Sequence, residues 1–500
     1  MKNRSWAWAI LAGMPIFVAG CSGNINTPIL PAVNGLNGAL AARGVAGSVI
    51  AIDGSAFGTP ASSAAGYSVA FEDAMTADLV AEAAVDLSTP GNWTDDFIKA
   101  TVPSQLAVGK TYMVVVKTPS GTSNAASFIV VPPESFSPQT MVWSETSPLP
   151  AARQGFSTVA GTMGTGADVF IYAIGGNTAT SGTAGGDAAN EGTVFMNRVN
   201  SGDGTLVDPS WTSLTGLPGK RGFAAAVLAN SYSSTISGTA IYVLGGLDGT
   251  GTATDTVYYA LPTSYGTIPA PGSGGSWTTT TPLPQPLSAA AVAIFHGWIY
   301  VAGGDGRNGA PVAAAYCAKI NPGGTLGSWT TLTSLPVPLA FHRLVVLNGT
   351  LCVLGGDNAS ADPISGFSSA AAQDSVYFDP IDQRTGALGA AWTVGGNGLS
   401  GAREKFTAAA AGSEILVSGG LYAGHPGSSE ESYASVNADG SLTSFTAVTG
   451  LQTISGSGGY AFYNHSSCLF VDASGNAHVL ILGGADVATG ALHADVWCQH

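Results

Sequence analysis

Short apolar strands that end in a Gly-Gly pair recur six times in the last two-thirds of the chain. The strands are rich in Val, Ile, Leu and Tyr, as in Ile241-Tyr242-Val243-Leu244. β-Branched and aromatic residues favour strands, and glycine lets the backbone turn where a Cβ would be crowded. The pairs are Gly175-Gly176, Gly245-Gly246, Gly303-Gly304, Gly355-Gly356, Gly419-Gly420 and Gly483-Gly484. A tandem repeat of this length predicts a fold built from six similar units.

Other positions repeat around the glycine pairs. A Trp and a Leu-Pro turn precede most of them, and an acidic residue followed by an apolar-aromatic strand comes after several, as in Asp374 to Tyr377. Each unit therefore contains four short strands within roughly fifty to seventy residues, the size of one propeller blade. Large aromatic faces are expected between blades, in the core. The residues concerned are Trp143, Trp211, Trp277, Trp329 and Trp392.

The repeated unit resembles the kelch repeat, and the resemblance covers residues 140–500. It implies an all-β fold, a six-bladed β-propeller. The strand around Trp143 matches the fourth, outer strand of a blade but precedes the first complete unit, whereas the last unit ends after a third strand near Trp497. We therefore predict that the Trp143 strand completes the sixth blade and joins the two ends of the propeller.

The first twenty residues have the features of an export signal. Lys2 and Arg4 precede an apolar stretch, and a small-residue cleavage site ends at Cys21. The stretch is shorter than the roughly twenty residues that a membrane-spanning helix needs. The segment resembles a bacterial lipoprotein signal. This resemblance implies that residues 1–20 are removed and that Cys21 carries the lipid, followed by a polar tether to residue 27.

The same resemblance implies a location. Ser22 is not acidic, which in lipoproteins of this type favours the outer membrane. We therefore expect a cell-envelope protein that touches the membrane through its lipid anchor alone and faces either the periplasm or the outside.

Residues 28–132 carry alternating apolar strands with frequent turn signals and no helical period, which predicts a small sandwich. The motifs Gly54-Ser55-Ala56-Phe57-Gly58 and Gly121-Thr122-Ser123-Asn124 resemble those of an IPT/TIG domain, an immunoglobulin-like module. Residues 133–139 contain Pro133 and Pro138 and are predicted to form a short, stiff linker.

The net charge limits the partners that the chain can bind, and the positions of its cysteines limit its possible disulfides. The chain has 31 acidic and 16 basic side chains and a formal net charge of −15, so its surface repels nucleic acid. Four cysteines follow Cys21. In an oxidising compartment Cys468 and Cys498 are candidates for a disulfide across the last blade, and buried free thiols are the alternative.

The usual catalytic and metal-binding motifs are missing from the sequence. It contains no His-Glu-x-x-His, Cys-x-x-Cys or Gly-x-Ser-x-Gly, and its seven histidines are not spaced as ligands. We therefore predict no catalytic residue, no metal and no cofactor.

One group of polar residues is expected to converge. In a propeller, the loop before the first strand of a blade and the loop after the second strand lie at the same mouth of the central channel. Three blades carry a basic-x-x-Phe pattern in the first loop, and four carry an Asp that we place right after the glycine pair, in the second loop. The candidate ligand-binding residues are Arg153, Lys220, Arg403, Asp248, Asp305, Asp357 and Asp486.

Two roles are open for these residues. Basic and acidic groups around a concave mouth suit a ligand with many hydroxyls or a carboxylate. Alternatively, each Arg binds loop carbonyls and each Asp caps its own turn, so that the whole set is structural.

These features favour a monomeric, non-catalytic lipoprotein whose propeller binds a glycan or a protein. The alternative is an enzyme acting on sugars, because sialic-acid mutarotases and galactose oxidase-like proteins use related propellers. We cannot place the copper ligands of the oxidase-like proteins in this sequence, whereas a mutarotase needs only a few polar groups. A purely structural envelope component is a third hypothesis, and it predicts an extended apolar surface patch.

Overall fold

The computed structural model describes residues 29–37, 41–60, 65–163, 168–179, 189–230, 238–359, 371–422, 430–437, 441–448, 462–486 and 489–499. Within these ranges the chain is all-β, apart from short 3₁₀ turns such as Pro138–Thr140, so the all-β part of the predicted fold class is confirmed. No helix in this part of the chain is long and apolar enough to cross a membrane. The predicted signal, Cys21 and the tether lie outside the described residues.

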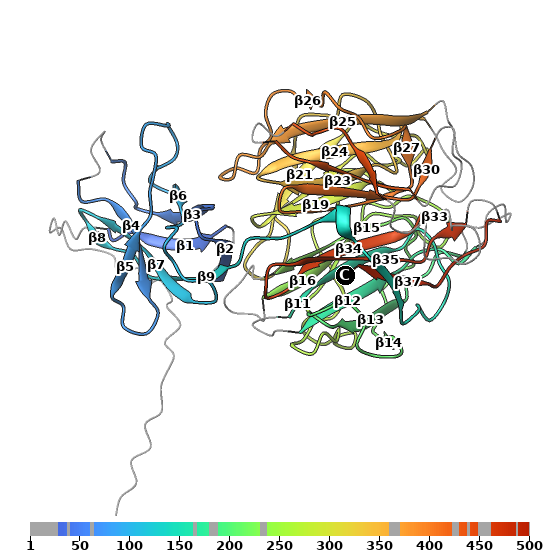
Figure 1. Cartoon of the computed structure of the whole chain (residues 1–500), viewed down its shortest axis with the longest axis horizontal. Coiled ribbons are helices and arrows are strands. Elements are labelled where there is room, and N and C mark those ends of the chain that lie inside the picture. Colours follow the sequence, from blue (N-terminus) through green and yellow to red (C-terminus); the bar gives the residue numbers. More distant parts are fainter. Residues whose placement is uncertain are drawn as a thin grey trace, which may run out of the picture.

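Two sheets form the N-terminal part of the molecule (Figure 1). Its core contains buried aromatic and aliphatic residues from both sheets, among them Ile50, Phe71, Val114 and Phe128. One sheet has the order β1 (Ala32–Leu36), β3 (Val49–Ser55), β6 (Phe97–Thr101). The other has the order β2 (Ala41–Val45), β9 (Ala126–Val131), β7 (Thr111–Thr118), β4 (Ser68–Asp73), β5 (Leu79–Glu82), with β8 (Gly121–Thr122) paired to β7. Two sheets around one core agree with the sandwich that the alternating pattern predicts.

Six four-stranded antiparallel sheets follow, one for each glycine pair. In chain order the first three are β11 (Ser157–Thr162), β12 (Val169–Ile174), β13 (Val194–Val199), β14 (Thr212–Ser213); β15 (Ala225–Asn230), β16 (Thr239–Leu244), β17 (Val257–Ala260), β18 (Thr278–Thr279); and β19 (Ala291–Phe295), β20 (Trp298–Ala302), β21 (Ala315–Lys319), β22 (Thr330–Thr331). The next two are β23 (Arg343–Leu347), β24 (Thr350–Asp357), β25 (Ala372–Pro380), β26 (Thr393–Val394); and β28 (Thr407–Ala411), β29 (Glu414–Ser418), β31 (Glu431–Ser435), β32 (Thr446–Val448).

The sixth sheet unites the two ends of this region. It has the order β34 (Ser466–Val471), β35 (Ala477–Leu482), β37 (Val496–Gln499), β10 (Trp143–Thr146). Strand β10 runs antiparallel to β37, with Trp143 opposite Gln499 and Thr146 opposite Val496. The predicted pairing of the Trp143 strand with the last unit is therefore observed.

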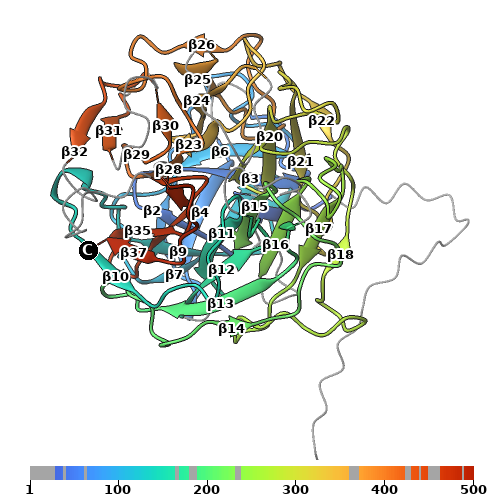
Figure 2. The ribbon, with the colours of Figure 1, turned by 90° about the vertical axis from the view of Figure 1, so that its right-hand side faces the viewer.

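The first strands of the six sheets contact one another in cyclic order, β11–β15–β19–β23–β28–β34, and β34 contacts β11 again (Figure 2). Just before each first strand, one residue donates its N–H to the carbonyl of its counterpart in the neighbouring sheet, at 2.7–3.2 Å. The six ring residues, Gly155, Phe223, Ala289, Phe341, Lys405 and Asn464, close a cycle of six hydrogen bonds. All six have positive φ, between 49° and 57°. Each sheet thus occupies one position around a common centre.

The glycine pairs join neighbouring sheets. In each pair both residues have positive φ, and a Cβ on the first glycine of the second pair would lie 2.2 Å from the Leu287 carbonyl oxygen of the next sheet. The second glycine donates its N–H to that same carbonyl, as Gly246 does to Leu287 at 2.8 Å. The repeat that dominates the sequence is therefore a packing requirement between sheets.

The tryptophans lie between sheets as predicted. Trp143, Trp211, Trp277 and Trp392 are buried, and Trp329 is partly buried against the same kind of cluster. Four of the indole N–H groups donate to a backbone carbonyl of the preceding sheet, at 2.9–3.2 Å. That of Trp143 donates to Glu431 Oε2 at 2.9 Å.

The predicted disulfide between Cys468 and Cys498 is wrong. Both thiols are free and buried, as are those of Cys317 and Cys352. Cys468 lies opposite Leu480, and Leu480 lies opposite Cys498, so strand β35 separates the two cysteines. Two strand spacings of about 4.8 Å place their Cα atoms well beyond the separation of about 7 Å that a disulfide tolerates.

Candidate functional site

The predicted site residues all lie near one end of the six sheets, where the first strand begins and the second strand ends. We call this end the mouth; it comprises the ring residues and the residues that follow the glycine pairs, Asn177, Leu247, Asp305, Asp357, Leu421 and Ala485. Strands β27 (Arg403–Glu404), β30 (Leu421–Tyr422) and β33 (Phe462–Tyr463) mark it in Figure 1, on the side away from the N-terminal sheets.

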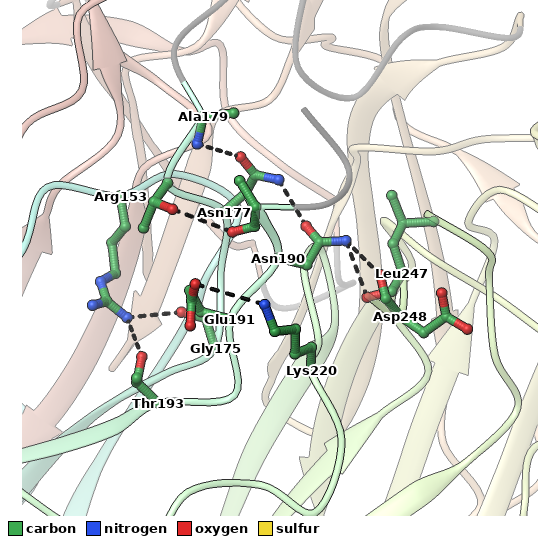
Figure 3. Close-up of polar contacts among 12 residues, drawn as sticks. Arg153, Gly175, Asn177, Ala179, Asn190, Glu191, Thr193, Lys220, Leu247 and Asp248 are labelled. Atoms are coloured by element: carbon green, nitrogen blue, oxygen red, sulfur yellow. Dashed lines mark hydrogen bonds and ion pairs between the residues drawn. The ribbon is translucent and has the colours of Figure 1, made fainter. Parts of the chain in front are cut away.

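Arg153 is buried and occupied by structural contacts (Figure 3). Its Nη1 donates to the Gly175 carbonyl oxygen and to Thr193 Oγ1, both at 2.9 Å, and the guanidinium lies 4.8 Å from the centre of the Phe195 ring. Burial lowers the pKa of Arg153 to about 10. These contacts match the structural alternative, in which the arginine holds the glycine turn of its own sheet.

Arg403 has the same role in the fifth sheet. It is buried, and its Nη1 donates to the carbonyl oxygens of Gly419 and Glu430 at 3.2 and 3.3 Å. Neither arginine is therefore arranged to receive an anionic ligand.

Lys220 does not occupy the equivalent position in the second sheet. The carbonyls of Arg221 and Arg153 both accept the N–H of a second glycine, so Arg221 is the true counterpart. Arg221 donates to Tyr258 Oη at 3.1 Å. Lys220 is about half exposed and pairs with Glu191 at 3.9 Å (Figure 3).

The four aspartates divide into two classes. Asp248 and Asp486 cap surface turns, with Oδ1 of Asp248 accepting the N–H groups of Thr250 and Thr252, and Oδ1 of Asp486 accepting that of Thr489. The hydrogen bonds from Thr250 and its backbone hold the pKa of Asp248 below its ordinary value. Both residues fit the turn-capping alternative.

Asp305 and Asp357 are buried beside the ring of hydrogen bonds. Each pairs through its backbone with the residue just before a ring residue, Asp305 with Ser288 and Asp357 with Ala340. In the fifth sheet, the residue just before the ring residue Lys405 is Glu404, so it matches Ser288 and Ala340 in position. The side chains of Glu404 and Lys405 are both fully buried. Asp305, Asp357, Glu404 and Lys405 form what we call the acidic cluster.

Contacts within the acidic cluster leave carboxylate oxygens without donors. Lys405 Nζ lies 3.6 Å from Glu404 Oε1 and 5.0 Å from the centre of the Phe341 ring. Asp357 Oδ1 accepts the N–H of Ala359 at 2.8 Å. Among the described residues, no group donates a hydrogen bond to Asp305 Oδ1, Asp357 Oδ2 or either oxygen of Glu404.

Burial decides the protonation of this cluster. It raises the pKa of Asp305 to about 7, with a further rise from the charge of Asp357 and a smaller opposing effect of Lys405. It also raises the pKa of Glu404 to about 8, where the carboxyl of Asp357 adds to the effect and Lys405 opposes it. Protonated Glu404 can donate to Asp357, so near neutral pH the cluster holds protons that it can release.

A network of buried amides completes the mouth on its other side. Asn464 Nδ2 donates to Gln154 Oε1 at 2.9 Å, and Asn177 Nδ2 donates to Asn190 Oδ1 at 2.8 Å. Asn190 also donates to the carbonyl oxygens of Leu247 and Asp248, which links the first and second sheets (Figure 3). In this half of the mouth the side-chain amides form hydrogen bonds with one another and with backbone carbonyls.

Glu404, Lys405 and the amides were not among the predicted site residues. Their positions in the repeat could have identified them, because each lies at a fixed number of residues from a glycine pair or from a first strand. The prediction instead selected residues by their type. In the described part of the chain, no three His, Cys, Asp or Glu side chains are grouped so that they could hold a metal ion. The acidic cluster can accept hydrogen bonds and exchange protons.

Comparison with known protein families and with curated proteins finds no match to this chain.

Proposed function

We propose that residues 140–500 form a closed six-bladed propeller of the kelch type, carried by a lipid-anchored envelope protein. The six four-stranded sheets, the cyclic contacts of their first strands and the cycle of six hydrogen bonds support this architecture. The N-terminal sandwich, an IPT/TIG-like module in this proposal, holds the propeller away from the lipid on Cys21. Its sheets lie on the side of the propeller opposite the mouth (Figure 1).

The anchor has its own test. Cys21→Ser removes the thiol that would carry the lipid, so the protein should leave the detergent phase of a Triton X-114 partition. Unchanged partitioning of this variant would refute the lipoprotein assignment, without bearing on the propeller.

The propeller binds a hydroxyl-rich ligand, a glycan, at its mouth without catalysing a reaction. The observation that carries this proposal is the acidic cluster, whose carboxylate oxygens lack donors from the described residues. Because these oxygens are covered in this structure, the proposal requires the neighbouring side chains to move aside when the glycan binds. Sugar hydroxyls supply such donors, and hydrogen bonds from O–H to carboxylate are among the strong ones. The engagement of Arg153 and Arg403 by carbonyls argues against an anionic ligand at this site.

One observation favours a second candidate, a sugar mutarotase. A carboxyl group with a pKa of about 7, that of Asp305, can both give and take a proton near neutral pH, as general acid-base catalysis requires. Ring opening and closing of a sugar needs this proton transfer and no metal. Accelerated interconversion of sugar anomers, followed by NMR, would favour the enzyme over the binding protein.

A glycan array with the mature chain from Ser22 onward tests the binding proposal. The informative variant is Glu404→Gln, because Gln resembles the protonated Glu404 of the folded protein and should preserve the fold. Glu414→Gln is a matched control, since Glu414 lies on β29 and accepts a hydrogen bond from Ser435. Array signals that fall in Glu404→Gln and persist in Glu414→Gln support the proposal. No signal, or capture of a protein partner that both variants retain, would refute glycan binding at the mouth.

A further inference from the structure

A cavity lies at the end of the molecule opposite the mouth, between the N-terminal sheets and the propeller. Its volume is about 650 Å³, within the range of small-molecule sites. Strand β2 and the end of β9 line one side, and the end of β11, the start of β12 and the β34–β35 turn line the other. The proposed glycan site contributes no residue to it.

The cavity walls combine aliphatic and polar side chains, and five of the aliphatic ones are Val or Leu. Val45 and Val131 face it from the N-terminal part, while Val169, Leu469 and Val471 face it from the propeller. Val45 and Val131 are register partners on adjacent strands, and Ala42, on the other face of β2, belongs to the N-terminal core. The outer face of the β2–β9 pair therefore presents two valines to the apolar part of a ligand, with Arg43 on the same face of β2.

Three charged side chains line the cavity, those of Asp472, Glu134 and Arg43. They differ in whether they already make hydrogen bonds within the chain. Oδ1 of Asp472 accepts the N–H groups of Ser474 and Asn476, and Oδ2 accepts Asn476 Nδ2. Glu134 Oε2 accepts the N–H of Gly412 at 3.0 Å. Arg43 lines the cavity on the same strand as Val45 and makes no hydrogen bond or ion pair with the other described residues. The group left to recognise a ligand is a guanidinium, which favours a carboxylate.

Three sets of contacts hold the cavity walls in position. Arg384 Nη2 lies 2.8 Å from both carboxylate oxygens of Asp96, joining the propeller to the N-terminal part. Ser135 donates to the Gly475 carbonyl oxygen at 2.7 Å and accepts the N–H of Ala477 at 2.8 Å. The Ser135 contacts fix the linker against the β34–β35 turn that forms the floor, and the Glu134 contact joins the linker to the turn between β28 and β29. The cavity is therefore already formed in the folded protein.

We propose that this cavity binds an amphiphilic carboxylate, a fatty-acid-like molecule whose chain lies against the valines and leucine and whose carboxylate pairs with Arg43. This site is independent of the proposed glycan site.

Calorimetric titration of the mature chain from Ser22 onward with decanoate, below its micelle concentration, tests the proposal. Decanoate should bind, and decylammonium and a hexuronate should not. Arg43→Gln should weaken decanoate binding roughly ten- to hundred-fold, the loss expected for a hydrogen bond to a charged group. Arg307→Gln, which changes an exposed arginine far from the cavity, is the matched control.

A second variant tests the cavity itself. Val45→Trp should fill it from an exposed-face position and abolish decanoate binding while the thermal unfolding transition is retained. The proposal is overturned if decanoate fails to bind, if Arg43→Gln or a folded Val45→Trp binds it as well as the parent chain does, or if decylammonium or the hexuronate binds equally well. None of these outcomes depends on the glycan array.

Discussion

Buried arginines at the sheet entrances act on the backbone around them. Arg153 and Arg403 each donate to the carbonyl of the first glycine of their own sheet's pair, and Arg153 also covers the Phe195 ring. A glycine turn with positive φ leaves its carbonyls without the partners that regular strands provide, and a guanidinium can serve several of them at once. At this scale, a basic residue near the mouth supports the fold.

Arg153→Ala should therefore lower the free energy of unfolding by about 1–3 kcal/mol, the cost of leaving hydrogen bonds to a charged group unmade. Lys220→Ala should change it by less than about 0.5 kcal/mol, because exposed ion pairs contribute little. Urea denaturation of both variants measures the difference. If the two variants are equally stable and only Arg153→Ala loses glycan binding, the structural role is wrong and Arg153 is a ligand-binding residue.

The acidic cluster makes stability depend on pH in a particular direction. Asp305 and Glu404 have pKa values of about 7 and 8 in the folded chain, against ordinary values of 3.8 and 4.5. Between these limits the folded state binds more protons than the unfolded state, so this contribution to stability is complete below about pH 4 and is lost as the pH rises to 8.

Asp357→Asn should make that loss smaller, because the charge of Asp357 contributes to both raised pKa values. Thermal unfolding at pH 8 should show this variant more stable than the parent chain, by up to about 1.4 kcal/mol for each pKa unit recovered, with little difference at pH 5. Asp248→Asn is the control, since the lowered pKa of Asp248 predicts no gain at high pH. Parallel pH profiles for Asp357→Asn and the parent chain would contradict the coupling.

At the scale of elements, the seam strand β10 completes the sixth sheet from more than 350 positions away in the sequence. Ser144 lies directly opposite Cys498, and its Oγ is 3.2 Å from the Cys498 sulfur. Opposed residues of an antiparallel pair have Cα separations within the disulfide range. This register provides a covalent test of how the two ends of the propeller meet.

Ser144→Cys should form a disulfide with Cys498 under oxidising conditions and raise the melting temperature. Glu145→Cys is the matched control, because its side chain points to the opposite face of the strand. Peptide mapping by mass spectrometry identifies the linked peptides. Failure of Ser144→Cys to cross-link in the folded protein, or equal cross-linking of Glu145→Cys, would contradict the observed register.

At the scale of the whole molecule, the repeated architecture could be predicted because its signals are packing requirements. Glycine pairs and tryptophans recur wherever two sheets meet, so their spacing gives the number of units and the position of the seam strand. The chemistry of the mouth could not be predicted in the same way. Asp305 directly follows its glycine pair, whereas Asp248 and Asp486 come one residue later, and neighbouring residues on a strand point to opposite sides.

The same one-residue offset separates Arg221 from Lys220. Residue type alone grouped these side chains, but register decides which are buried at the ring and which face solvent. The disulfide prediction failed for a related reason, because β35 lies between the first and third strands of the sixth sheet.

Locating the bound ligand is the most direct test of the central claim, that the acidic cluster at the mouth is the binding site. The measurement is a crystal structure of the mature chain with the glycan that gives the strongest array signal. We predict that its hydroxyls lie at hydrogen-bonding distance, about 2.5–3.0 Å, from the carboxylates of Asp305, Asp357 or Glu404. A glycan bound on the outer strands or on the N-terminal sheets, with these carboxylates untouched, would contradict the claim.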